Sequence, residues 1–161
     1  MAIRKILTDN DPMLRDKSRE VTEFNKRLHQ LLDDMTETME LANGVGLAAV
    51  QVGVLRRVVL VDAGDDDGVI ELINPKIIEV SDEKQCGSEG CLSYPGIYGT
   101  VERPMCVTVR AQNRNGDFFE VSGEELKARA FCHELDHLEG IIFQDHATEI
   151  FEVGDDDSDE D

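Results

Sequence analysis

Basic residues are scarce in this sequence, which has 16 lysines and arginines against 35 aspartates and glutamates and a formal net charge of −19. Nucleic acids and anionic membrane surfaces are bound mainly by clustered Lys and Arg, so we expect neither as a partner. Six of the acidic charges lie in the last seven residues. We therefore assign residues 151–161 to an acidic, disordered tail, with a protein-interaction segment as the weaker alternative.

Long hydrophobic runs are also absent. Nothing approaches the roughly 20 apolar residues of a transmembrane helix, and the apolar N-terminal run is too short for a signal peptide. Without a secretory signal, the four cysteines favour a reducing compartment, and we expect a cytoplasmic protein of a bacterium or of a virus infecting one. No internal repeat or interdomain linker is visible, so residues 1–150 are predicted to form one domain.

Two helices are predicted. Residues 22–42 have apolar side chains at a three-to-four spacing, which indicates an amphipathic helix that ends at Asn43-Gly44. A capping-box spacing at residues 122–125 predicts the start of a second helix that runs to about Glu139 and stops at Gly140.

Between the two helices the sequence alternates short β-branched runs with turn residues. Residues 65–68 and 113–116 are typical of hairpin connections. The predicted strands are 57–61, 69–73, 76–80, 105–109 and 117–121. This order favours an α+β fold, with antiparallel or mixed sheets packed around the second helix.

The most informative segment is His133-Glu134-Leu135-Asp136-His137, in the second half of the second predicted helix. Helical residues turn by about 100° each, so two histidines four apart differ by roughly 40° and can reach one metal. Glu134 then projects near a water bound to that metal, which is an arrangement of metal-dependent hydrolases. Catalytic sites of this kind usually take three protein ligands, so a third ligand is needed.

Cysteine is the best source of that third ligand. Phe143 stands where the metzincin pattern requires a histidine, and the chain has little room for a later helix that could supply a glutamate. His146 lies beyond the predicted helix and is expected at the surface. Cys91 lies in a polar, glycine-containing segment that we interpret as a loop, and a thiolate binds divalent iron, zinc or cobalt tightly.

Two other kinds of site stay open at this point. Cys86 and Cys91 with His133 and His137 form C-x4-C and H-x3-H pairs, which is the ligand set of a closed structural zinc site. Against it, the 41 residues between Cys91 and His133 far exceed a zinc-finger loop, and Glu134 would have no function. The other alternative is an HExxH peptidase that cuts internal amides.

The glycine-rich segment at residues 44–53, GVGLAAVQVG, superficially fits a dinucleotide-binding fingerprint. That fingerprint follows a strand and opens a helix, whereas this segment follows a helix and precedes a strand. We instead expect close approach of the backbone to an extended peptide, with Gln51 as an amide donor toward a developing oxyanion. The plain structural alternative is a glycine turn with a core glutamine.

Three segments together resemble the motifs of peptide deformylase, the enzyme that removes the formyl group from nascent N-formylmethionyl chains. They are GVGLAAVQVG, EGCLS at residues 89–93 and HELDH at residues 133–137, in that order and with these separations. The opening ILTDNDPMLR at residues 6–15 is also similar to that family. The resemblance spans roughly residues 2–150.

The resemblance implies a catalytic role for each motif. The metal ligands would be Cys91, His133 and His137. The metal would be ferrous iron most often, with zinc, nickel or cobalt as alternatives. Glu134 would act as general base and acid for a metal-bound water that attacks the formyl carbonyl, with release of formate. The oxyanion would be held by the metal, the Gln51 amide and the Leu92 backbone N–H.

The resemblance also implies how a formylmethionyl peptide binds. The substrate backbone would lie as an added strand between Val45 and Gly46 on one side and Gly90 on the other. The methionine side chain would enter an apolar pocket with Val45, Leu126 and Ala130 as walls. Nascent chains would therefore be the partner.

Asp136 fits neither a ligand nor a base, because it points away from the histidine face. We expect it to form an ion pair with Arg103, with an ordinary surface aspartate as the alternative. Residues 89–104 and 128–140 resemble the plastid-like type 1B branch more than the usual bacterial one.

Two residues depart from the usual bacterial pattern. Arg129 stands near the methionine pocket where an apolar residue is expected, and Cys132 stands where a glutamine is frequent. The chain also ends soon after Phe151 in acidic residues, in place of the C-terminal helix implicated in ribosome docking. We therefore expect only transient proximity to the ribosome, without a helix of that kind.

Overall fold

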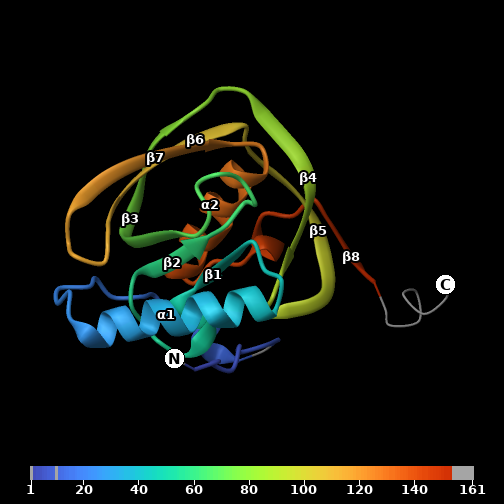
Figure 1. The fold of residues 1–161 in the computed structure, drawn as a ribbon. Helices are drawn as coiled ribbons and strands as arrows, with labels where there is room; N and C mark the ends of the chain where they lie inside the picture. The colour runs from blue at the N-terminus through green and yellow to red at the C-terminus, as the bar shows by residue number, and fades with distance from the viewer. Residues whose placement is uncertain (1, 10, 154–161) are drawn as a thin grey trace.

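The computed structural model describes residues 2–9 and 11–153. Its strands form a five-stranded sheet in the order β1-β2-β3-β6-β7 and a three-stranded sheet in the order β4-β5-β8, and all neighbouring strands are antiparallel (Figure 1). The strands are β1 Gly46–Ala48, β2 Val58–Val61, β3 Ile70–Val80, β4 Lys84–Cys91, β5 Tyr94–Pro104, β6 Cys106–Gln112, β7 Phe118–Glu124 and β8 Glu149–Glu152. The predicted α+β fold is confirmed in its antiparallel form.

Two α-helices and three short 3₁₀ helices complete the described chain. The α-helices are α1 Lys26–Leu41 and α2 Leu126–Leu138, and the 3₁₀ helices are η1 Pro12–Arg15, η2 Ala49–Val52 and η3 Phe143–Asp145. Within the described residues, no helix combines the length and the apolar character needed to cross a membrane.

The five-stranded sheet is buried on both faces at strand β2. All four of its residues are buried, with Val58 and Leu60 in the core cluster of α1 and Val59 and Val61 in that of α2. Successive side chains of a strand point to opposite faces, so an unbroken apolar run suits a strand covered on both sides. The sheet therefore carries α1 on one face and α2 on the other.

Helix α2 lies in the middle of the molecule, where the strands of both sheets surround it (Figure 1). Eleven of its thirteen residues are buried. A smaller apolar cluster that includes Tyr94, Val101 and Phe143 fills the space beside the three-stranded sheet. The central position of α2 places its HExxH segment where the two sheets meet, as the sequence predicted.

The starts of both helices differ from the prediction. Helix α1 begins at Lys26, because the side chain of Asn25 caps it by accepting the N–H of Leu28 at 3.1 Å. The predicted capping box of α2 is wrong, because residues 122–124 belong to β7 and Glu125 has a φ of 55° with no side-chain cap. The predicted stop is confirmed, since α2 ends at Leu138.

The strand predictions succeed for four of the five strands of the five-stranded sheet and fail elsewhere. The two hairpin turns are confirmed, since β2 pairs with β3 and β6 with β7. The predicted strands 69–73 and 76–80 form one strand, β3, with an irregular register near Asn74, whose φ is 53°. Strands β1, β4, β5 and β8 were not predicted. Residues 151 and 152 were assigned to the acidic tail, whereas both belong to β8, and tail residues 154–161 lie outside the described chain.

Candidate active site

A cleft of about 510 Å³ opens between the N-terminal half of α2, the segment around β1, and strands β4 and β5. Its volume is within the range of small-ligand sites. Ten of the eleven expected site residues, all but His137, line it: Val45, Gly46, Gln51, Gly90, Cys91, Leu92, Leu126, Ala130, His133 and Glu134. The structure therefore brings together segments that are up to 89 residues apart in the sequence.

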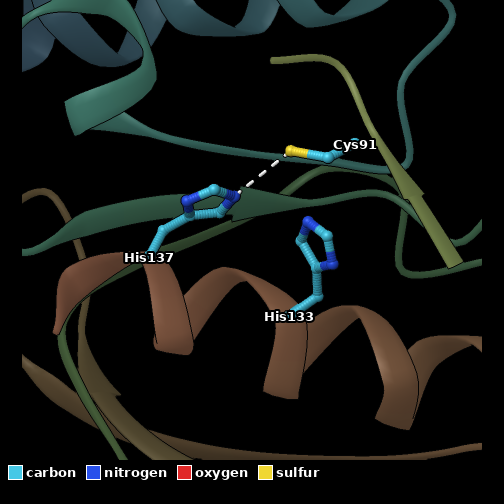
Figure 2. A group of neighbouring side chains, drawn as sticks. All are labelled: Cys91, His133 and His137. Atoms are coloured by element: carbon cyan, nitrogen blue, oxygen red, sulfur yellow. Dashed lines mark hydrogen bonds between the residues drawn. The ribbon is translucent and has the colours of Figure 1, made fainter. Parts of the chain in front are cut away.

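Cys91 and His133, which line the cleft, form with His137 a cluster whose ligand atoms all lie within 4.8 Å of one another (Figure 2). The Sγ atom of Cys91 is 3.3 Å from Nε2 of His137, and the two imidazole rings are 5.1 Å apart. Both histidines project from α2 toward the end of β4, where Cys91 lies. One thiol and two imidazoles at this spacing are a donor set for a divalent first-row metal.

The alternative of a closed four-ligand site is not supported by the geometry. Cys86 is exposed on β4, and within the described residues the metal-competent group contains only one cysteine. Burial raises the pKa of the Cys132 thiol to about 11, which disfavours a thiolate at that position. His146 is exposed, as expected, and lies 3.3 Å from Asp136.

The buried carboxylate of Glu89 orients His133. Oε1 of Glu89 lies 3.0 Å from Nδ1 of His133, and a carboxylate can only accept, so Nδ1 carries the hydrogen. The other nitrogen, Nε2, is then free to offer its lone pair toward Cys91. Histidines that bind metals usually donate their second ring N–H to a carboxylate in this way.

Two buried guanidinium groups hold Glu89 in turn. Arg103 makes two hydrogen bonds to it, at 2.7 and 2.9 Å, and Arg129 makes one at 2.8 Å. Burial alone would raise the pKa of Glu89, but the hydrogen bonds from Arg103 and His133 hold it well below its usual range. Arg103 also donates to Asp136 at 3.0 Å, which confirms the expected ion pair.

Sequence reasoning missed the place of Glu89 in this network. A signal was available, because Glu89 and Cys91 are two residues apart and a strand places such residues on one face. The segment was instead interpreted as a loop. The same network explains Arg129, which lines the cleft while its guanidinium group donates to Glu89 and to the Val101 carbonyl.

His137 is fully buried, and burial together with the neighbouring His133 lowers its pKa well below the ordinary value. A neutral imidazole keeps the lone pair that a metal requires. Glu134 is also buried, and one of its carboxylate oxygens, Oε1, has no hydrogen-bond partner among the described residues. An unsatisfied buried carboxylate that lines a cleft fits a site that holds a metal and water.

Two further features of Glu134 concern its reactivity. Burial raises its pKa to about 7, with the nearby charges of Glu89 and Asp136 adding to the effect and His133 opposing it. A Cβ atom at Gly46 would lie only 2.6 Å from Oε2 of Glu134. The glycine of β1 therefore leaves the space that the carboxylate occupies.

Gln51 is held with its amide nitrogen toward the cluster. Its Oε1 accepts the N–H of Ala48 at 2.9 Å, which fixes which end of the amide is which. Nε2 donates to Ser93 Oγ at 3.0 Å and lies 3.5 Å from Cys91 Sγ. Gln51 is buried with both ends of its amide hydrogen-bonded and also lines the cleft, so its role as an oxyanion donor stays a prediction.

Similarity to known proteins agrees with this geometry. Residues 3–152 match the polypeptide deformylase family. The chain belongs to the peptide deformylase family. A peptide deformylase of Alkaliphilus metalliredigens is 59% identical over 145 residues, which cover 90% of this chain and 97% of that protein.

Solved structures are similar over the same region. The peptide deformylase of Thermotoga maritima has a TM-score of 0.87 at 39% identity, covering 91% of this chain and 98% of that one. A class I type b peptide deformylase of Acinetobacter baumannii has a TM-score of 0.87 at 34% identity, covering 91% of this chain and all of that one. Assignment of this chain to the type 1B branch stays a prediction.

Membership of this family defines the general activity. The chain is a metal-dependent hydrolase that removes the N-formyl group from nascent peptides. Family membership therefore favours a deformylase over the alternative of an HExxH peptidase that cuts internal amides.

Proposed function

We propose that the chain hydrolyses the formyl group of N-formylmethionyl peptides, with Cys91, His133 and His137 as the three ligands of one divalent metal. The observation that carries this proposal is the convergence of a thiol and two imidazoles within 4.8 Å beside the buried carboxylate of Glu134. When bound, the metal would act as a Lewis acid that activates water and polarises the formyl oxygen.

Glu134 is the proposed proton carrier. Its Oε2 lies 4.0 Å from Nε2 of His133, so the carboxylate is next to the ligand cluster without being held by it. In this role it accepts a proton from the attacking water and delivers it to the departing amine nitrogen. The C–N bond of the formamide breaks, and the products are formate and a free N-terminus.

Two donors are proposed to stabilise the oxyanion that develops on the formyl oxygen. The first is Nε2 of Gln51, whose orientation is already fixed by Ala48 and Ser93. The second is the backbone N–H of Leu92, next to the cysteine ligand in the chain. A donor that needs no reorientation stabilises the transition state more than one that must be ordered during the reaction.

We propose that the substrate backbone lies between the edge strands of the two sheets. Strand β1 ends the order of the five-stranded sheet and β4 ends that of the three-stranded sheet, and both line the cleft. An extended peptide could pair with β1 near Val45 and Gly46 and with β4 near Gly90, as in β-strand addition. The methionine side chain would then lie against Val45, Leu126 and Ala130.

We propose ferrous iron as the native metal, as the family resemblance implies. The thiolate and imidazole donors would also accept zinc, nickel or cobalt. The partners would be nascent chains in the bacterial cytoplasm, with transient proximity to the ribosome. The net charge of −19 argues against extended contact with RNA.

The decisive experiment compares formyl-Met-Ala-Ser with its unformylated twin, using anaerobically purified protein of measured metal content. We expect formate release from the first peptide only, in proportion to bound iron. Absence of formate release by metal-loaded protein would contradict the proposal. Cleavage of an internal amide in the unformylated peptide would favour a peptidase instead.

A further inference from the structure

Three strands contribute to one row of residues beside the cleft. Gly90 of β4 is directly opposite Tyr98 of β5, and Tyr98 is directly opposite Phe151 of β8. Residues directly opposite each other in antiparallel strands present their side chains on the same face. Gly90, Tyr98 and Phe151 therefore form one cross-strand row on the three-stranded sheet.

The aromatic ring of Tyr98 leans over Gly90. A Cβ atom at Gly90 would lie 2.6 Å from Cε2 and 2.9 Å from Cδ2 of Tyr98, so only glycine leaves room for the ring. An aromatic side chain that covers a glycine of the neighbouring strand is a known stabilising arrangement in sheets. The ring thus reaches from β5 across β4 toward the outer edge of the sheet.

Phe151 supports the ring from the opposite side. The two rings are stacked, with centroids 6.2 Å apart and planes 21° apart, although each residue is about 40% exposed. Backbone hydrogen bonds hold β8 alongside β5, and next to them the Val153 N–H donates to the Gly96 carbonyl at 2.7 Å. Of the two aromatic residues, Tyr98 lines the cleft and Phe151 does not.

We infer that Phe151 is a positioning residue for substrate binding, which holds Tyr98 over Gly90 as a wall of the peptide cleft. The inference rests on the proposed function, in which the substrate adds to the edge of β4 at Gly90. Adjacent strands are about 4.8 Å apart, so a ring confined to β5 would be roughly 10 Å from the added strand. By covering Gly90, the ring of Tyr98 comes within contact of a bound peptide. Strand β8 thereby contributes to recognition without touching the substrate.

The test measures kcat and KM separately for formyl-Met-Ala-Ser. Phe151→Ala is expected to raise KM about three- to tenfold, the range for loss of one aromatic pair, with kcat within about twofold of the parent. Phe151→Tyr, which keeps the stacked ring, is expected to restore KM. Phe118→Ala is the matched control, because Phe118 is an exposed aromatic on β7, paired with Arg110 and away from the cleft.

A double mutant separates positioning from an independent effect. If Phe151 acts through Tyr98, the Tyr98→Ala/Phe151→Ala protein should have the same KM as Tyr98→Ala alone. Additive effects, an unchanged KM in Phe151→Ala, or a fall in kcat alone would overturn the inference. Circular dichroism checks folding, and Phe151→Leu replaces Phe151→Ala in the same cycle if the alanine variant is unfolded. Failure of the parent protein to release formate would overturn the proposed function instead.

Discussion

The two sheets of this protein differ in what they bury. The five-stranded sheet buries apolar side chains between α1 and α2, and its strand β2 is fully enclosed. The three-stranded sheet buries ions: Glu89 of β4 and Arg103 of β5 are each more than 90% buried, while Tyr98 and Phe151 on the same sheet are exposed. The first sheet is thus enclosed by apolar packing, whereas the second combines a smaller apolar cluster with a buried ionic network beside α2.

The largest difference in metal content and activity is expected between variants of the two cysteines of β4, Cys91 and Cys86. Cys91→Ser should lose the metal and the activity, because a serine hydroxyl is a much poorer ligand than a thiolate. Cys86→Ser, on the same strand but exposed, should retain both. Metal content of the purified variants checks this. Equal metal loss in the two variants would favour the closed zinc site.

Glu134→Gln is expected to separate metal binding from turnover. The amide cannot accept the proton, so kcat should fall by about 10²- to 10⁴-fold, while the metal stays bound. Glu139→Gln is the control, since Glu139 lies at the end of α2 and pairs with Arg57 at the surface. Formate assays and metal analysis of both variants provide the comparison. Near-normal activity in Glu134→Gln would remove this residue from the proposed role.

One substitution in each sheet compares the loss of a buried ionic network with the loss of a buried apolar side chain. Glu89→Gln leaves Arg103 and Arg129 without their shared charge and should reduce the free energy of unfolding by about 3–5 kcal/mol. Leu72→Ala in β3 should cost about 2–5 kcal/mol by creating a cavity.

Urea unfolding measures both changes, and metal affinity tells them apart. Only Glu89→Gln should weaken metal binding, by about 10- to 100-fold, since Glu89 orients His133. Unchanged affinity in Glu89→Gln would contradict the distinction between the two sheets.

Gln51→Ala removes one proposed oxyanion donor. It should raise the activation free energy by about 3 kcal/mol, which is roughly a hundredfold in kcat, with little effect on KM. Single-turnover kinetics with a formylated peptide is the appropriate measurement. A change in KM alone would assign Gln51 to substrate binding in the ground state.

The smallest effect is expected on the α1 side, at the buried carboxylate of Asp34. Burial would raise its pKa, but hydrogen bonds from the Ala2 N–H, Gln30 and Arg4 outweigh burial and lower it. A lowered folded-state pKa adds stability above the unfolded pKa, near 4, and this is lost as pH falls through the folded value.

Asp34→Asn should therefore cost about 1 kcal/mol at pH 7 and progressively less as the pH falls below about 4. Urea unfolding at several pH values measures the difference, with Asp117→Asn in an exposed turn as the control. A cost that does not change with pH would show that the charge of Asp34 is not the cause.

How far the sequence predicted this structure depends on the sheet. Strands β2, β3, β6 and β7 were found because they pack on apolar cores and have β-branched residues in the pattern that burial requires. Strands β4 and β5 were missed because their sequence is dominated by glycine, charge and turn-like residues. Those residues are present for the cleft: Gly90 makes room for Tyr98, and Glu89 and Arg103 form the buried network.

The candidate site was predicted more completely than the sheet that holds it. His133 and His137 follow from helical spacing alone, and Cys91 and Gln51 from motifs whose order resembles a known family. Glu89 could not be recognised while its segment was interpreted as a loop, because its effect depends on sharing a strand face with Cys91. The support of Tyr98 by Phe151 depends on pairing between β5 and β8, which no local pattern predicts.

The open edge of β4 has a thermodynamic consequence. Within the described residues no strand pairs with its outer side, so an extended ligand bound as we propose would complete the three-stranded sheet. A ligand that binds only the folded state at 100 times its Kd adds about 2.7 kcal/mol to the free energy of unfolding. The melting temperature of this protein should therefore rise with the concentration of peptide, and the heat stability of the enzyme becomes a measure of how fully its sheet is occupied.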